Sequence, residues 1–102
     1  MTWIEALAFD DVFMGDVMPL TVADRELALY GIDGEVFVTD NLCTHGMARL
    51  CDGFLEGHEI ECPVHQGRFD VRTGMATCAP ATAPIRVYPV KIEAGRVWVR
   101  LD

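Results

Sequence analysis

With 102 residues and 51% apolar side chains, the chain can form one compact domain and is too hydrophobic for a disordered segment. Sixteen acidic residues against eight basic ones give a net charge of −8, and the basic residues do not cluster, so neither nucleic acid nor a membrane surface is an expected partner. No apolar run reaches the roughly eighteen residues of a membrane helix, and the first residues lack a signal-peptide pattern, so we expect a cytoplasmic protein.

Short alternating segments separated by turn residues predict an all-β protein. In chain order, the expected strands are residues 3–8, 18–22, 26–32, 35–39, 59–61, 68–71, 85–93 and 96–101. We expect one helical turn at 9–13, capped by an Asp, and a tight hairpin at Asp33-Gly34. Pro19 and Pro89 indicate edge or interrupted strands, because proline has no amide hydrogen to pair. Residues 54–57 are expected to form a turn.

Two motifs each combine one cysteine with one histidine. The first reads Cys43-Thr44-His45-Gly46, and the second reads Cys62-Pro63-Val64-His65-Gln66-Gly67. Cysteine thiolates and neutral imidazoles bind zinc and iron–sulfur clusters. In a Rieske centre, one iron of a [2Fe–2S] cluster has two cysteine ligands and the other has two histidine ligands. The motifs therefore predict Cys43 and Cys62 on one iron, with His45 and His65 on the other.

Structural zinc is the main alternative, because it also binds two cysteines and two histidines, and it would make the chain a zinc-stabilised interaction module. Familiar zinc fingers, however, pair cysteine with cysteine and histidine with histidine. The other two cysteines, Cys51 and Cys78, are expected to be free thiols packed as small apolar residues. A disulfide between them, or Cys51 in place of a ligand, remains open.

The chain resembles the Rieske-type ferredoxins of multicomponent aromatic-ring dioxygenases, most closely those of the naphthalene dioxygenase type. Residues 40–46 and 67–71 contribute most to the resemblance, which extends from Trp3 to Ile92. It implies that the two cysteines bind an inner iron and the two histidines an outer iron near the surface. It also implies that the proline-containing segment 78–84 packs over the cluster.

The expected architecture is a β-barrel-like sandwich with a small inserted subdomain that binds the cluster. Residues 1–42 and 80–102 would form the base, and residues 43–79 would form the cluster-binding subdomain of this single Rieske domain.

The expected function is one-electron transfer and not catalysis. An oxygenase iron site of two histidines and one carboxylate cannot be built, because His58, which we expect in a solvated turn, is the only histidine left. A monomer is the default expectation. By resemblance, the protein would accept electrons from an NAD(P)H-dependent flavin reductase. It would pass them to a terminal aromatic-ring-hydroxylating oxygenase. A further alternative is the small subunit of a nitrite-reductase-like enzyme.

The acid excess has two readings, which the sequence leaves open. It can serve solubility, or it can provide an acidic docking face that speeds encounter with a basic partner.

The resemblance also implies a low reduction potential. High-potential family members carry one more cysteine in each motif, joined as a disulfide, and two hydroxyl donors after the second histidine. Those positions hold Ala48, Val64, Gly67 and Phe69 here. Fewer donors stabilise the reduced cluster less, so we expect a potential near about −150 mV, the low end of the Rieske range.

Overall fold

Strands make up most of the computed structural model, which describes residues 2–44, 48–64, 66–79, 81 and 83–102. In chain order, the strands are β1 (Trp3–Ala8), β2 (Asp16–Val22), β3 (Arg25–Ile32), β4 (Glu35–Asp40), β5 (Phe54–Glu56), β6 (Glu59–Glu61), β7 (Arg68–Asp70), β8 (Ala76–Cys78), β9 (Val87–Tyr88), β10 (Val90–Glu93) and β11 (Arg96–Arg100). Two short 3-10 turns, η1 (Phe9–Asp11) and η2 (Leu50–Asp52), are the only helical segments of the described residues. The predicted all-β class is confirmed. No helix in the described part of the chain has the length and apolarity needed to cross a membrane.

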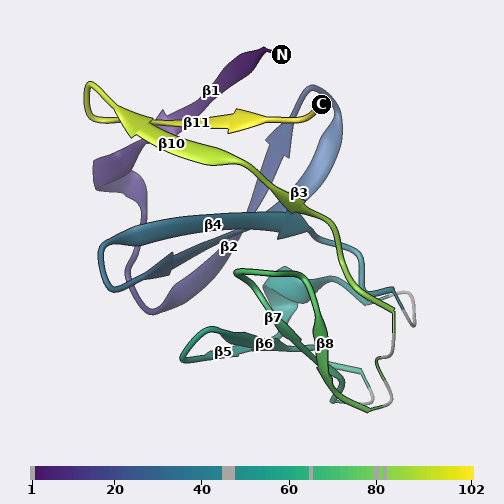
Figure 1. Ribbon diagram of the computed structural model, residues 1–102. Coiled ribbons are helices and arrows are strands. Elements are labelled where there is room, and N and C mark those ends of the chain that lie inside the picture. Colours follow the sequence, from purple (N-terminus) through teal and green to yellow (C-terminus); the bar gives the residue numbers. More distant parts are fainter. Residues whose placement is uncertain (1, 45–47, 65, 80, 82) are drawn as a thin grey trace.

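The strands form three antiparallel sheets that lie one above another (Figure 1). Their strand orders are β1-β11-β10, β2-β3-β4-β9 and β5-β6-β7-β8. Asp33 and Gly34 both have positive φ in the β3–β4 turn, as the hairpin prediction required. Pro19 lies in β2 at the edge of the middle sheet, where its missing amide hydrogen breaks no ladder. The first and last strands pair with each other, so both termini lie at the same end of the molecule (Figure 1).

The middle sheet contributes to two cores, and β3 is the strand that joins them. Leu27 and Leu29 pack into the first core, on the side of the β1-β11-β10 sheet. Ala28, Tyr30 and Ile32 alternate with them and pack into the second core, toward the β5–β8 sheet. A strand buried on both faces reads as a continuous apolar run, which is what residues 27–32 show. The second core contains the cysteines of both motifs.

Three details of the secondary structure differ from prediction. Residues 54–56 form β5 and not a turn, because Gly57, with φ of 59°, and His58 are enough to reverse the chain. Strand β8 was not predicted. The turn η1 begins after Ala8 without a side-chain cap, so the predicted Asp cap is wrong.

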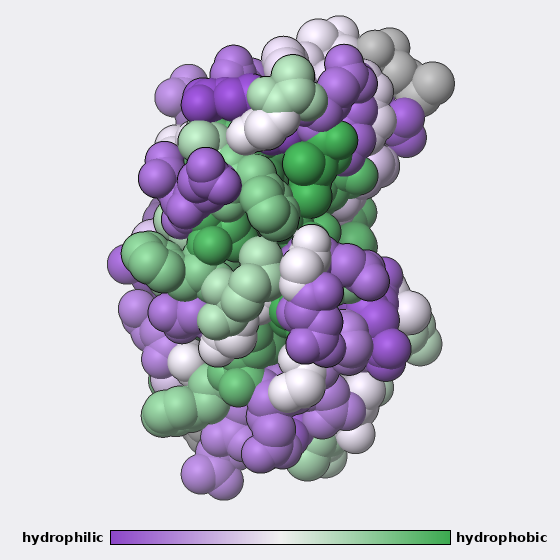
Figure 2. Space-filling view, turned by 90° about the vertical axis from the view of Figure 1, so that its left-hand side faces the viewer, coloured by the Kyte–Doolittle hydropathy of each residue, from purple (hydrophilic) through white to green (hydrophobic). Residues whose placement is uncertain are grey.

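Several large apolar side chains remain on the surface of the protein. Phe13 is 70% exposed and Phe54 is 67% exposed. In the space-filling view, apolar surface lies between polar residues on the face that is at the left of Figure 1 (Figure 2).

Candidate metal centre

Both cysteine motifs form loops that close at their cysteine in the same way. The Cys43 amide donates to the Ala48 carbonyl at 2.9 Å, and the Cys62 amide donates to the Gly67 carbonyl at 2.7 Å. Each bond joins a cysteine to the residue five positions later. We call residues 43–48 the first arm and residues 62–67 the second arm. The predicted ligands His45 and His65 belong to these arms but lie outside the described residues.

The structure brings the two motif cysteines together in the second core. Cys43 is 2% exposed and Cys62 is fully buried, and both pack with Leu50, Ile60 and Phe69. Burial raises the pKa of the Cys62 thiol, a hydrogen bond from the Val64 amide lowers it, and the adjacent Cys43 side chain raises it further.

Two neighbouring thiols in apolar surroundings are a poor place for uncompensated negative charge. A metal centre supplies the compensating cations and needs thiolate ligands, so the donor pair fits an iron–sulfur cluster. The described residues, which do not include the predicted ligands His45 and His65, contain no group of three or more side chains that could hold a metal ion.

Asn41 connects the two segments that flank the first arm. Its side chain is buried, its Oδ1 accepts the Cys51 amide at 2.8 Å, and its Nδ2 donates to the Cys51 sulfur at 3.3 Å. Its backbone carbonyl also accepts the Leu50 amide at 2.6 Å. One asparagine therefore holds together the segments on either side of the first arm, a role that the sequence analysis did not identify.

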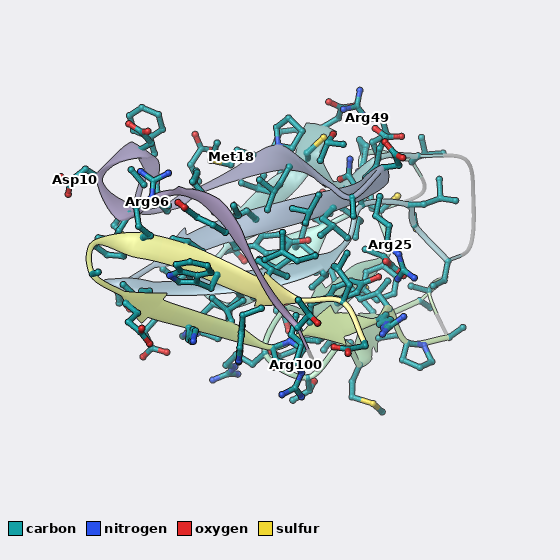
Figure 3. The ribbon with its side chains drawn as sticks, turned by 90° about the horizontal axis from the view of Figure 1, so that it is seen from above. Asp10, Met18, Arg25, Arg49, Arg96 and Arg100 are labelled. Atoms are coloured by element: carbon teal, nitrogen blue, oxygen red, sulfur yellow. The ribbon has the colours of Figure 1, made fainter. Side chains whose placement is uncertain are left out.

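A polar network that joins β3, β4 and β9 lies beside Asn41. The Tyr88 hydroxyl donates to the Asp40 carboxylate and accepts a hydrogen bond from Arg25 at 3.4 Å. Burial is the largest of the effects that raise the pKa of Tyr88. Arg49 forms an isolated antiparallel β-bridge with Leu42. Arg25 and Arg49 lie on the opposite side of the molecule from Arg96 and Asp10 (Figure 3).

Arg68 closes the second arm on the β7 side. Its guanidinium contacts Glu56 at 3.0 Å, Glu59 at 3.3 Å and Glu61 at 2.9 Å. Glu61 directly precedes Cys62 and pairs with Arg68 across β6 and β7. The three carboxylates raise the pKa of the guanidinium further above its usual range. The four residues come from three short strands, β5, β6 and β7, and the spacing of the residues in the sequence did not predict how these strands pair.

Ala81 and Ala83, in the segment expected to pack over the cluster, lie against the two arms. Ala81 is buried in the second core beside Gly67, and the Thr44 hydroxyl donates to the Ala83 carbonyl. Pro80, which belongs to this segment, lies outside the described residues.

Two predictions about the remaining histidine and cysteines need correction. His58 is half-buried, and its ring lies edge-on to Phe37 with 5.9 Å between centroids, so it is not simply a solvated turn residue. Cys78 is exposed and not packed. All four cysteines are described and none forms a disulfide.

Two closed arms with neighbouring buried thiols on a β-sheet base indicate a protein that binds a metal centre. The Rieske [2Fe–2S] domain family matches residues 2–89. The chain belongs to this family and holds one [2Fe–2S] cluster, which rules against the structural-zinc alternative.

Curated and solved relatives agree with this assignment. The chain is 63% identical to the naphthalene 1,2-dioxygenase system ferredoxin component of Pseudomonas putida, over 98% of this chain and 96% of that protein. It is 44% identical to the Sphingomonas yanoikuyae B1 ferredoxin, with a TM-score of 0.92 over 99% of this chain and 100% of that one. It also matches a chain in the complex of reduced oxygenase and oxidized ferredoxin of carbazole 1,9a-dioxygenase, at 36% identity and a TM-score of 0.89, over 98% of this chain and 97% of that one. The protein is thus an electron carrier and not a catalytic subunit.

Proposed function

We propose that Cys43 and Cys62 bind the inner iron of the cluster and that His45 and His65 bind the outer iron. The observation that carries this proposal is the pair of adjacent, buried cysteine side chains at the start of two loops closed in the same way. The bound cluster would accept and release one electron at a time. The chain's own residues hold the arms in place through Asn41 and Arg68.

We further propose that the protein receives electrons from an NAD(P)H-dependent flavin reductase. It would deliver them to a terminal oxygenase that hydroxylates an aromatic ring of the naphthalene type. The name of the Pseudomonas relative supports a role in a dioxygenase system of the naphthalene type. The solved carbazole dioxygenase complex supports direct contact between ferredoxin and oxygenase. We propose a cytoplasmic monomer with a base of residues 1–42 and 80–102. The third sheet supports this division, because it lies wholly within 54–78.

Electron paramagnetic resonance of the dithionite-reduced protein tests the ligand set. We expect the Rieske spectrum, with its low average g-value, together with two irons and two acid-labile sulfides per chain. Four cysteine ligands would give a spectrum with a higher average g-value and would reject the histidine assignment. Stoichiometric zinc in a colourless protein would reject the cluster itself.

Replacing Phe69 with tyrosine tests the low-potential argument. Phe69 is fully buried in the core that contains both motif cysteines, and it offers no hydroxyl. A new hydrogen bond worth about 1 kcal/mol more to the reduced cluster would raise the midpoint by about 40 mV. A redox titration of the wild-type protein should give a midpoint near about −150 mV.

Phe54→Tyr is the matched control, because it adds the same hydroxyl at a side chain that is 67% exposed. Its midpoint should equal that of the wild type. The hydrogen-bond argument is rejected by a wild-type midpoint above about +100 mV, or by equal shifts in the two variants.

A further inference from the structure

The second arm is the loop of the hairpin that β6 and β7 form. The last cross-strand pair before the arm joins Glu61 to Arg68, and just beyond it the Cys62 amide donates to the Gly67 carbonyl. The Arg68 Nε and Nη2 atoms both donate to the same Glu61 oxygen, at 3.1 and 2.9 Å. Because consecutive Cα atoms are about 3.8 Å apart, this charged pair directly adjoins the proposed ligand Cys62.

Arg68 is surrounded by more negative charge than it can neutralise. Besides Glu61, its guanidinium contacts Glu56 at 3.0 Å and Glu59 at 3.3 Å, so three carboxylates share one positive charge. Within the described part of the chain, no other basic side chain pairs with these carboxylates. We call the four side chains the Arg68 network. Together they place an excess of negative charge beside the second arm.

Partial burial makes the charges of the Arg68 network effective. The Arg68 side chain is 28% exposed and that of Glu59 is 38% exposed, whereas that of Glu56 is 78% exposed. Salt screens partly buried charges much less than exposed ones. Asp70 and Arg72, which follow on the same side of the hairpin, pair with each other at 2.8 Å and add little net charge. The Arg68 network is therefore the main source of uncompensated charge on this hairpin.

We propose that the Arg68 network lowers the reduction potential of the bound iron–sulfur cluster through its net negative charge. The proposal rests on the proposed ligand set, and it adds a second cause of a low potential to the shortage of hydroxyl donors. Reduction adds one electron, and hence one negative charge, to the cluster. Coulomb repulsion from nearby carboxylates opposes this added charge, whereas the Arg68 guanidinium favours it. Carboxylates and guanidinium therefore shift the potential in opposite directions.

Redox titration of charge-removing variants of the holoprotein tests the proposal by the sign of the shift. Glu59→Gln should raise the equilibrium constant for reduction about threefold, which is a rise in midpoint of about 30 mV at about 59 mV per tenfold. Glu56→Gln should raise the midpoint less, because water and salt screen this exposed carboxylate more strongly. Arg68→Gln should lower the midpoint. Arg68→Lys keeps the positive charge and should keep the wild-type midpoint.

The ion pair between Glu5 and Arg96 provides the matched controls. It joins β1 to β11 with 2.8 Å between Nε and Oε2, on the other side of the middle sheet from the Arg68 network (Figure 1). Glu5→Gln and Arg96→Gln each remove one charge and should leave the midpoint unchanged.

Two further measurements separate an effect of charge from a change in the geometry of the arm. The shift in Glu59→Gln should shrink as the salt concentration rises from about 0.01 M to about 1 M, because the Debye length falls from about 30 Å to about 3 Å. The paramagnetic spectrum of Glu59→Gln should match that of the wild type, since removal of a distant charge leaves the ligands in place. An altered spectrum together with a salt-independent shift would show a merely structural role and would reject the proposal.

The signs of the shifts decide the outcome. Unchanged midpoints in both glutamate variants, or shifts of the same sign in Glu59→Gln and Arg68→Gln, would overturn the proposal, and so would equal shifts in the controls. If Arg68→Gln does not retain its cluster, the glutamate variants and Arg68→Lys decide by the same criteria. A wild-type protein without a Rieske spectrum would instead reject the ligand set, so the two failures are distinguishable.

Discussion

Replacing Cys62 with serine should abolish the visible absorbance and the paramagnetic signal of the purified protein. Cys62 is fully buried next to Cys43, so no other side chain can take its place without a movement of the second arm. A serine hydroxyl is a harder and far less acidic ligand than a thiol, and it does not replace thiolate on an iron–sulfur cluster. Iron and acid-labile sulfide should fall from two each per chain to near zero.

Two further cysteine variants provide the controls. Cys78→Ser changes an exposed side chain and should keep the full cluster content. Cys51→Ser changes a half-buried side chain whose sulfur accepts a hydrogen bond from Asn41, and a serine oxygen can accept the same bond. Cluster loss in Cys51→Ser combined with retention in Cys62→Ser would show that Cys51 is the ligand and would reject our assignment.

Because metal binding is coupled to folding, Cys62→Ser should also lower the denaturant concentration at which the protein unfolds. Wild-type protein stripped of its cluster is the reference for this measurement. If the stripped protein and the variant unfold together, the loss of stability comes from the missing cluster and not from the serine itself.

Much of the fold was predictable because local chemistry determines it. The Asp33-Gly34 turn and the alternation along β11 specify their hairpins without help from distant residues. Strands β5 and β8 have three residues each and pair only within the small third sheet. Their residues carry no periodic signal of useful length, so tertiary pairing decides their conformation.

The motifs predicted which residue types would meet at the site but not how the arms are held. The bonds that do so join Asn41 to Cys51 and Thr44 to Ala83, pairs that are 10 and 39 residues apart. Sequence spacing has no signal for such contacts, because they depend on the packing of the second core. His58 was misjudged for the same reason, since Phe37 reaches it from another sheet.

Replacing Gly53 with alanine should destabilise the protein through a steric conflict with the backbone just before the second arm. Gly53 follows η2 with φ of −90°, a value that any residue adopts, so its backbone conformation does not require glycine. A Cβ atom there would lie 2.0 Å from the carbonyl oxygen of Glu61. That carbonyl belongs to the residue before Cys62, and the Gly53 amide is itself bonded to the Leu50 carbonyl at 2.9 Å.

The contacted oxygen belongs to the backbone, so the methyl group can be accommodated only if the chain after η2 moves away from the end of β6, which leads into the second arm. Overpacking of this kind costs about 2 to 3 kcal/mol. Because the movement would also change the spacing of the Cys43 and Cys62 side chains, we expect an altered paramagnetic spectrum and a lower cluster content. Anaerobic urea unfolding and spectroscopy of the same holoprotein measure both effects.

Gly57→Ala is the matched control, because Gly57 has open space around it but a positive φ, whereas Gly53 has an ordinary φ but no space for a Cβ atom. Gly57 has φ of 59° but no atom within 4 Å of an added Cβ. Alanine there should cost about 1 kcal/mol of backbone strain and leave the cluster spectrum unchanged. If Gly53→Ala unfolds at the same urea concentration as Gly57→Ala with an unaltered spectrum, the close approach of Gly53 to Glu61 does not set the cluster geometry. If only Gly53→Ala changes the spectrum, the glycine is required by its close approach to the Glu61 carbonyl and not by the flexibility of the chain.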